Sequence, residues 1–253
     1  MKILGVIPAR YAATRFPGKP LADICGKPMV LHVYDRAKRA KLLTELYVAT
    51  EDERIVRVVE QAGGKAIMTS ASHQSGSDRL GEVAGKIDAD IIVNIQGDEP
   101  LLEPEMLDEM VRPLIDDKTI LMGTLKKRIS NPEDLQNPNI VKVVCDKNGF
   151  AIYFSRSLIP YPKSGWKDAS IHGLAEGDLA IYKHLGLYAY QKEFLMKFTQ
   201  LPVSPIEKIE GLEQLRALDN GYKIKVVETK FDTIAVDTPE DLERVIKVVS
   251  RMQ

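Results

Sequence analysis

Short apolar runs alternate with helix-like stretches through the first hundred residues, and this alternation limits the possible folds more than any other feature. The runs of strand length are 3–7, 46–49, 65–69 and 90–95. Between them, apolar residues at helical spacing predict helices at about 28–40 and 52–62. This order predicts a parallel sheet with helices on both faces. We therefore expect an α/β fold, a three-layer αβα sandwich of Rossmann-like type with a mostly parallel central sheet.

The second half of the chain departs from this alternation. A helix at 104–116 and a strand at 120–125 continue it, but 140–145 and 150–154 then predict a hairpin. Residues 156–183 are irregular in pattern. A strand at 184–190, helices at 192–199 and 212–218, and a strand at 223–227 complete the prediction. We expect one domain spanning 1–253, with about 150–190 as a small β-containing excursion.

The totals exclude several classes of partner. The chain has 253 residues and a net charge of −1, so no overall charge favours nucleic acid or an anionic membrane. No apolar run approaches the roughly 20 residues of a membrane-spanning helix. Cys25 and Cys145 form no C-x-x-C motif, which favours a reduced compartment and predicts a cytoplasmic location.

A cationic loop follows the first strand. Arg10, Arg15 and Lys19 lie within ten residues, and no acidic residue occurs before Asp23. In open α/β sheets ligands bind beyond the carboxyl ends of the strands, so this loop is a candidate for holding a polyphosphate. The alternative is a solvated loop without a special role.

Two carboxylates are candidates for a metal site. Asp98 follows the apolar run 90–95 after Gln96 and Gly97, where a carboxylate could hold Mg²⁺ together with substrate phosphates. It could equally stabilise a turn. Asp237 precedes a predicted helix capped by Thr238, and is either part of that cap or a second metal ligand.

A polar loop at 73–79 is open to two interpretations. Its Ser75-Gly76-Ser77 backbone could approach a ligand closely, with Arg79 nearby. Ser77 could instead cap the helix that follows.

Several common catalytic motifs are absent. The sequence has no G-x-G-x-x-G, no phosphate-binding G-x-x-x-x-G-K-[ST], no H-E-x-x-H or Cys/His zinc spacing, and no G-x-S-x-G. What remains is a cationic loop and two distant carboxylates, a combination suited to positioning and charge neutralisation.

Six motifs in order resemble the sugar nucleotidyltransferases, and among them the 3-deoxy-manno-octulosonate (Kdo) cytidylyltransferase family. They span nearly the whole chain: Ile7-Pro8-Ala9-Arg10 with Thr14-Arg15-Phe16-Pro17-Gly18-Lys19-Pro20-Leu21, Asn94-Ile95-Gln96-Gly97-Asp98-Glu99-Pro100, Tyr153-Phe154-Ser155-Arg156, Lys183-His184-Leu185-Gly186-Leu187-Tyr188, Leu212-Glu213-Gln214-Leu215-Arg216 and Val236-Asp237-Thr238-Pro239-Glu240-Asp241-Leu242.

The resemblance implies a nucleotidyltransferase fold and a reaction in which CTP and Kdo give CMP-Kdo and pyrophosphate. It also implies Mg²⁺ as cofactor, a cytoplasmic homodimer, and a role in lipopolysaccharide synthesis. The excursion at 150–190 would contribute to the sugar site and the dimer contact. By position, the resemblance implies these roles: CTP binding by Ala9, Arg10, Arg15, Lys19, Ser75, Gly76 and Arg79; Mg²⁺ binding by Asp98 and Asp237; sugar binding by Gln96, Arg156, His184, Tyr188, Glu213 and Gln214; and catalysis by Arg10, Arg15, Lys19, Asp98 and Asp237.

The residues agree with this chemistry but leave alternatives. The planar guanidinium of Arg156 suits the carboxylate of an acid sugar. Without the family, His184 would be interpreted as a core histidine. The acid sugar could also be 8-amino-Kdo or a sialic acid; Asp78, where related enzymes often carry Glu, bears on that choice. Another hypothesis is that the protein binds a nucleotide without catalysing a reaction.

Overall fold

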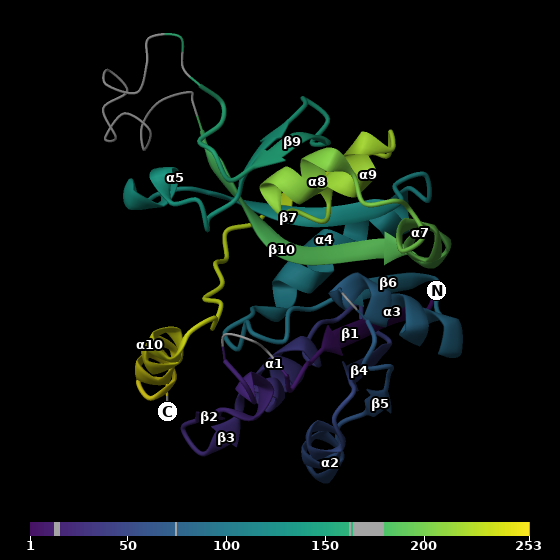
Figure 1. Cartoon of the computed structure of the whole chain (residues 1–253), viewed down its shortest axis with the longest axis vertical. Helices are drawn as coiled ribbons and strands as arrows, with labels where there is room; N and C mark the ends of the chain where they lie inside the picture. The colour runs from purple at the N-terminus through teal and green to yellow at the C-terminus, as the bar shows by residue number, and fades with distance from the viewer. Residues whose placement is uncertain (13–15, 74, 162, 164–179, 253) are drawn as a thin grey trace.

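A central β-sheet forms the middle of the molecule (Figure 1). The structure is a computed structural model, and it describes residues 1–12, 16–73, 75–161, 163 and 180–252. Its strands are β1 (Ile3–Pro8), β4 (Glu45–Thr50), β5 (Ala66–Met68), β6 (Ile91–Asn94), β7 (Met122–Arg128), β8 (Lys142–Cys145), β9 (Ala151–Ser155), β10 (Tyr182–Gln191) and β11 (Lys225–Glu228); β2 (Asp23–Ile24) and β3 (Lys27–Pro28) form a separate small ribbon. The helices are η1 (Lys19–Leu21), α1 (Met29–Ala37), α2 (Glu53–Gln61), α3 (Gly76–Lys86), α4 (Pro104–Asp116), α5 (Glu133–Gln136), α7 (Lys192–Phe198), α8 (Pro205–Glu210), α9 (Leu215–Asp219) and α10 (Pro239–Val249).

The strand order confirms the predicted α/β fold with a mostly parallel sheet. The order is β11-β7-β10-β6-β1-β4-β5, and β1 pairs in parallel with both β4 and β6. Only β10 interrupts this path, because it runs antiparallel to β6 and β7. The carboxyl ends of β1, β4 and β6 therefore meet at one edge of the sheet, where ligands bind in open α/β folds.

Both faces of the sheet are buried under helices, as the apolar runs predict. Alternate residues of β1 enter different clusters: Ile3 and Ile7 pack on one face, Leu4 and Val6 on the other. Residues from α1, α2 and α4 complete the first cluster, and residues from α3, α7 and α9 complete the second. Each fully buried aliphatic side chain contributes about 1.5–3 kcal/mol of transfer free energy.

The C-terminal helix lies against the N-terminal ribbon rather than on the sheet. Val236 and Val245 are buried with Ile24 and Met29 in a third cluster. Figure 1 shows α10 beside β2 and β3, far in sequence but adjacent in space. This packing brings the segment before α10 to the loop after β1.

Most predicted elements are confirmed, and the differences are local. The helix at 104–116 has the predicted limits, but the one expected at 212–218 begins only at Leu215. Gly211, with φ +62°, ends the preceding helix α8, and residues 213–214 form a turn before α9. The structure adds α8, which Ser204 caps together with Glu207.

The excursion contains both small and central strands. The predicted hairpin is confirmed as β8 and β9, whereas β10, at the end of the range 150–190, lies inside the main sheet. Residues 164–179 of this range lie outside the described residues. Cys25 and Cys145 are free thiols. Among the helices of the described chain, none combines the length and apolar character needed to span a bilayer.

Candidate active site

The loop after β1 is anchored by its own main chain. Ala9 is buried, and its N–H donates to the carbonyl oxygen of Ala49 at 2.9 Å. Tyr11 N–H donates to Glu51, and the Tyr11 carbonyl accepts from Gly18 N–H at 2.8 Å. Gly18 has φ +74°, a left-handed conformation that suits glycine and turns the chain into η1. The loop thus returns to place Lys19 above the sheet edge. Arg15 lies outside the described residues.

The segment after β6 touches the end of β1. A Cβ atom on Gly97 would lie 2.7 Å from the Pro8 carbonyl oxygen, closer than ordinary packing allows. Only glycine therefore lets this turn approach β1 so closely. The close approach sets Asp98 beside the cationic loop.

Lys19 joins the two predicted carboxylates. Its Nζ donates to Asp98 Oδ2 at 2.7 Å and to the Val236 carbonyl at 2.8 Å, and lies 3.5 Å from Asp237 Oδ1. The Asp98 carbonyl also accepts from Val236 N–H at 2.9 Å. The structure thus brings together Lys19, Asp98 and Asp237 from three distant parts of the sequence. We call these three residues the Lys19 cluster.

A third carboxyl next to the cluster has a different character. Glu99 is 6% exposed, and burial, reinforced by the charge of Asp98, raises its pKa to about 8. It is therefore mostly protonated at neutral pH, whereas Asp98 and Asp237 supply the negative charge that faces Lys19. Glu99 could not be identified as a site residue from the sequence, because burial of one position in a turn has no local signal.

Arg10 carries a buried donor without a partner. Its Nη2 is shielded from solvent and forms no hydrogen bond within the described ranges. Unpaired buried donors are rare and costly, so this guanidinium is suited to an anion that enters the site. The observation fits the predicted role in phosphate binding.

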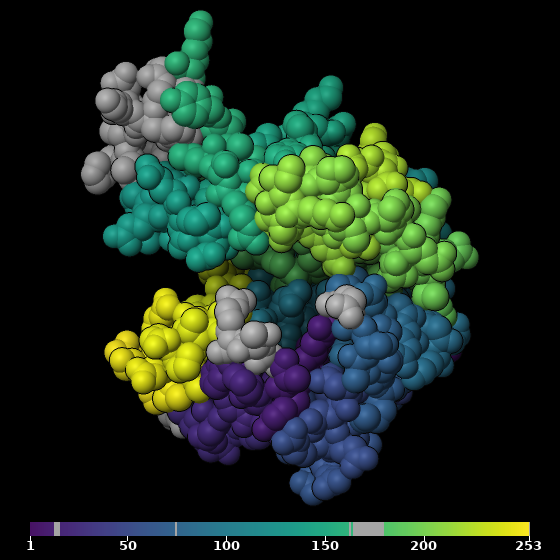
Figure 2. All heavy atoms as spheres, in the orientation of Figure 1, coloured from purple at the N-terminus to yellow at the C-terminus, as the bar shows by residue number. Residues whose placement is uncertain are grey.

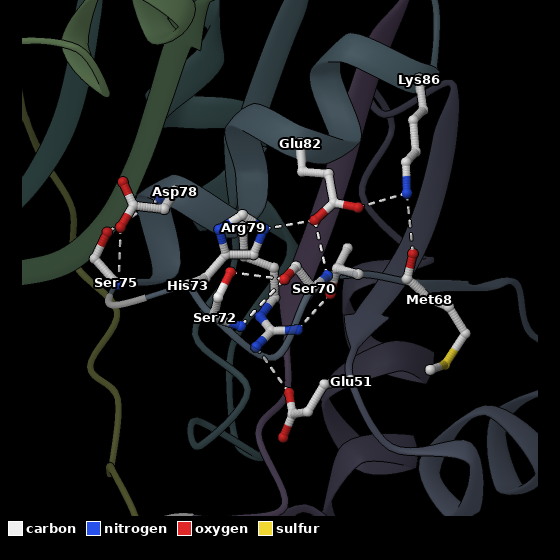
Figure 3. A network of polar contacts seen from close by, with 11 residues as sticks. Glu51, Met68, Ser70, Ser72, His73, Ser75, Asp78, Arg79, Glu82 and Lys86 are labelled. Carbon is white, nitrogen blue, oxygen red and sulfur yellow. Dashed lines mark hydrogen bonds and ion pairs between the residues drawn. The ribbon is translucent and has the colours of Figure 1, made fainter.

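The polar loop before α3 is held by a network of charges (Figure 3). Ser75, not Ser77, caps α3: its Oγ accepts from Asp78 N–H, and the Asp78 carboxylate accepts from Ser75 N–H. Arg79 is buried and lies 2.7 Å from Glu51 Oε2. Figure 3 shows that its guanidinium points away from Ser75 and toward Glu51. A Cβ on Gly76 would have Pro8 as its nearest neighbour, so the start of α3 lies beside the end of β1.

Glu82 stabilises the same loop from within α3. Its carboxylate accepts from Ser70 N–H at 2.9 Å and pairs with His73 and Lys86. These contacts, with Lys86 the largest cause, lower the pKa of Glu82 to about 2.

A polar cavity of about 390 Å³ lies next to the Lys19 cluster. Four predicted sugar-binding residues line it: Gln96, His184, Tyr188 and Gln214. Lys183, Glu99 and Asp232 also line it, and Lys183 lies 2.9 Å from Asp232. Figure 2 shows a hollow between the N-terminal part of the molecule, in purple and blue, and the later teal and green segments.

The polar groups of this cavity are arranged by strand β10. Gln96 Nε2 donates to the Gly186 carbonyl at 2.8 Å, and His184 Nε2 lies 2.9 Å from Thr124 Oγ1. Burial lowers the pKa of His184 to about 3 and raises that of Tyr188 well above its ordinary value. Gln214 is buried, and its Nε2 has no partner in the described structure.

Two predicted sugar-binding residues line other cavities. Glu213 lines a neighbouring cavity of about 680 Å³ with Ser75, accepts from Ser77 Oγ at 2.6 Å, and has its pKa raised by burial. Arg156 lines a third cavity of about 520 Å³. Its Nε and Nη1 donate to the carbonyl oxygens of Glu210 and Pro138 at 2.6 and 3.0 Å.

Comparison with known proteins identifies the family. A family model described as cytidylyltransferase matches residues 4–224. A 3-deoxy-manno-octulosonate cytidylyltransferase of Geobacter metallireducens is 55% identical over 253 residues, covering 100% of both chains. A protein of the same name from Geobacter sulfurreducens is 54% identical over 247 residues, covering 98% of this chain and 99% of the relative.

Solved structures agree with these relatives. A CMP:2-keto-3-deoxy-manno-octonic acid synthetase complexed with CTP matches with a TM-score of 0.91 and 42% identity over 100% of both chains. A 4-diphosphocytidyl-2C-methyl-D-erythritol synthase from Anaerococcus prevotii, 14% identical with a TM-score of 0.62 over 99% of both chains, shares the fold. The chain therefore belongs to the cytidylyltransferase family, and within it to the 3-deoxy-manno-octulosonate cytidylyltransferases.

Proposed function

We propose that this enzyme transfers CMP from CTP to the anomeric hydroxyl of 3-deoxy-D-manno-octulosonate (Kdo), giving CMP-Kdo and pyrophosphate. The observation that carries the proposal is the Lys19 cluster at the carboxyl edge of the sheet, beside a polar cavity. Family membership supports the same reaction, because relatives at 54–55% identity carry the name of this activity.

The cationic loop would bind the CTP phosphates. Arg10 has a buried donor without a partner among the described residues, and Lys19 already faces two carboxylates, so both cations are placed at the sheet edge. Each such contact to a phosphate oxygen is a charge-assisted hydrogen bond. The main chain at Ala9 and Gly76 and the side chain of Ser75 would lie against the nucleoside. Arg79 would act indirectly, because its guanidinium is engaged with Glu51.

Asp98 and Asp237 would hold Mg²⁺ together with the phosphates. Their donor set fits this ion, since two hard carboxylate oxygens stand together and Mg²⁺ is commonly bound by one or two carboxylates plus substrate phosphates. Among the described residues no group of three or more His, Cys, Asp or Glu side chains forms a complete protein cage. The bound ion would neutralise charge on the phosphates and lower the pKa of the attacking hydroxyl.

The sugar would occupy the cavity lined by Gln96, His184, Tyr188 and Gln214. The anomeric hydroxyl must attack the α-phosphorus in line with the departing pyrophosphate, while Arg10 and Lys19 hold the phosphate oxygens. Neutral Glu99 adds no negative charge that would repel the sugar carboxylate. The role of Arg156 stays a prediction: a carboxylate would replace main-chain carbonyls as the partner of its guanidinium.

Assembly and location are further parts of the proposal. A cytoplasmic homodimer that serves lipopolysaccharide synthesis follows from the family resemblance. Ile152 on strand β9 and Tyr161 are 60% and 73% exposed, so apolar side chains within 150–190 are available for a dimer contact there. A fully active protein that sediments as a monomer would remove this part.

Pyrophosphate release tests the assignment of the metal ligands. Asp98→Asn and Asp237→Asn should each abolish release from CTP and Kdo while the far-ultraviolet circular dichroism stays unchanged. Asp88→Asn is the matched control, because Asp88 is an exposed carboxylate that pairs with Lys2. Full activity in Asp98→Asn or Asp237→Asn would exclude that residue from the metal site.

Two alternatives remain distinct proposals. A cytidylyltransferase for 8-amino-Kdo or a sialic acid would use the same phosphate site, and Asp78 lines the cavity that also contains Glu213. A nucleotide-binding protein without turnover would have no need of two paired carboxylates around Lys19. Their presence therefore favours the enzyme.

A further inference from the structure

Thr124 has a buried hydroxyl that contacts His184, a residue that lines the sugar cavity. It lies on β7, is 0% exposed, and its Oγ1 is 2.9 Å from His184 Nε2. It is also 2.7 Å from the Leu187 carbonyl and 3.2 Å from the Leu185 carbonyl. One hydroxyl therefore meets one imidazole and two carbonyl groups.

A bulge in β10 creates this arrangement. The pairing of β10 with β7 passes directly from Leu185 opposite Leu125 to Tyr188 opposite Thr124. Two residues of β10 are thus left outside the regular ladder at this point. At the bulge, the Thr124 hydroxyl contacts the carbonyl oxygens of Leu185 and Leu187. The carbonyl of Gly186, between them, accepts from Gln96 Nε2 at 2.8 Å.

The hydrogen bonds of Thr124 determine the tautomer of the His184 ring. A carbonyl oxygen can only accept a hydrogen bond, and a threonine hydroxyl has one hydrogen to donate. That hydrogen goes to the carbonyl of Leu187, the shortest of the three contacts. Oγ1 must then accept from His184, so the ring hydrogen lies on Nε2. Because burial keeps the ring neutral at ordinary pH, Nδ1 carries a free lone pair.

This nitrogen belongs to a ring that lines the cavity. His184 lines the cavity, and within the described ranges no hydrogen bond to its Nδ1 is formed. Phe154 holds the ring edge-on at a centroid distance of 4.9 Å, so the imidazole is fixed in plane as well as in tautomer. With its low pKa, His184 is a poor proton acceptor for catalysis and a good neutral acceptor of a hydrogen bond.

We propose that Thr124 is a positioning residue that holds His184 as the Nε2–H tautomer, so that Nδ1 accepts a hydrogen bond from a hydroxyl of the bound sugar acid. The inference deepens the proposed function and rests on it for the identity of the sugar. Gln96 behaves similarly, since its amide nitrogen donates to the Gly186 carbonyl, and no described residue donates to its amide oxygen. Gln214 Nε2 adds a donor that has no partner among the described residues. The cavity thus offers two acceptors and a donor, a pattern suited to a polyhydroxy substrate and unfavourable to an analogue that lacks a hydroxyl.

The test reads the tautomer directly by nitrogen-15 NMR of the histidine rings. The chain has only four histidines, so His184→Gln identifies the signals of this ring by their loss. The wild-type protein should show His184 as Nε2–H from pH 6 to 8. Thr124→Val removes the acceptor and should give a mixture or the opposite tautomer, and Thr124→Ser, which keeps the hydroxyl, should restore the wild-type signals.

Kinetics with CTP and Kdo provide the second measurement. Thr124→Val should raise the KM for Kdo about tenfold, as expected when one hydrogen bond in a polar site is lost, with the KM for CTP changed less than about twofold. Equal loss for both substrates, an Nδ1–H tautomer in the wild type, or an unchanged tautomer in Thr124→Val would each overturn the proposal. If Thr124→Val does not fold, the wild-type and Thr124→Ser spectra still decide the tautomer. Absence of turnover with Kdo would instead contradict the proposed function, since the spectra do not depend on the substrate.

Discussion

Replacing Lys19 by methionine should strengthen the binding of a divalent cation to the protein without nucleotide. The Lys19 ammonium lies 2.7 Å from Asp98 and 3.5 Å from Asp237, so in this state it competes with a cation for both carboxylates. Toward CTP the same lysine should favour binding, because it would contact a phosphate. Lys19→Met should therefore strengthen the binding of the cation and weaken the binding of CTP, a combination that loss of the fold would not produce.

The distances give the size of the effect. At an effective dielectric constant of about 20, a charge pair at 2.7 Å has a Coulomb energy of about 6 kcal/mol before desolvation. The carboxylates of Asp98 and Asp237 are 26% and 43% exposed, so most of this is offset by solvation. A net contribution of about 1.5 kcal/mol, the lower end of the range for a hydrogen bond to a charged group, corresponds to roughly a tenfold change in affinity.

Manganese paramagnetic resonance measures this affinity without any reaction. Lys19→Met should bind Mn²⁺ about tenfold more tightly than the wild type in the absence of CTP. When Mn²⁺ is present, the same variant should bind CTP more weakly than the wild type does. Lys27→Met is the control, because Lys27 pairs with Asp35 on the surface. Weaker or unchanged Mn²⁺ binding in Lys19→Met would refute the competition between the ammonium and the cation.

Three further predictions concern stability and the placement of the site. Gly97→Ala should reduce pyrophosphate release more than tenfold and destabilise the fold by about 1–3 kcal/mol, because its Cβ would meet a carbonyl oxygen of β1; Gly85→Ala, which has open space in α3, should cost nothing in urea unfolding. The pKa of Glu82 is lowered to about 2, so its contribution to stability is present above its unfolded pKa and is lost as the pH falls toward 2. Glu82→Gln should therefore cost roughly 1–3 kcal/mol at pH 7 and less than about half of that near pH 3, and a pH-independent cost would contradict this. Arg216→Met should destabilise the protein by about 3 kcal/mol, because it leaves buried Glu207 without its 2.6 and 2.8 Å partner contacts; adding Glu207→Gln should recover part of the loss in thermal unfolding.

The architecture could be predicted from sequence because it follows from short-range patterns. Buried strands alternate with amphipathic helices, and Thr238 caps α10 as predicted, in a capping box with Asp241. The meeting of Asp98 with the cationic loop was also predictable, since both follow parallel strands and such strands share one edge. Asp237 needed the family resemblance, because it reaches Lys19 only through the packing of Val236 and α10 against the N-terminal ribbon.

Other features depend on contacts that a single sequence does not reveal. Buried Glu99 interacts with Thr233 and with the charge of Asp232, which lie far along the chain. The contact of Thr124 with His184 depends on a bulge between strands about 60 residues apart. The alternative in which Ser77 caps α3 is wrong, although Ser75 with Asp78 has the spacing of a capping box that the sequence reveals.

Pyrophosphate release from CTP and Mg²⁺, with Kdo, 8-amino-Kdo and a sialic acid supplied in parallel, tests the central claim most directly. We expect release with Kdo, far above that with the other two sugars. A preference for another acid sugar would contradict the substrate and leave the Lys19 cluster and its chemistry in place. No release with any of the three would contradict the assignment of the site as catalytic.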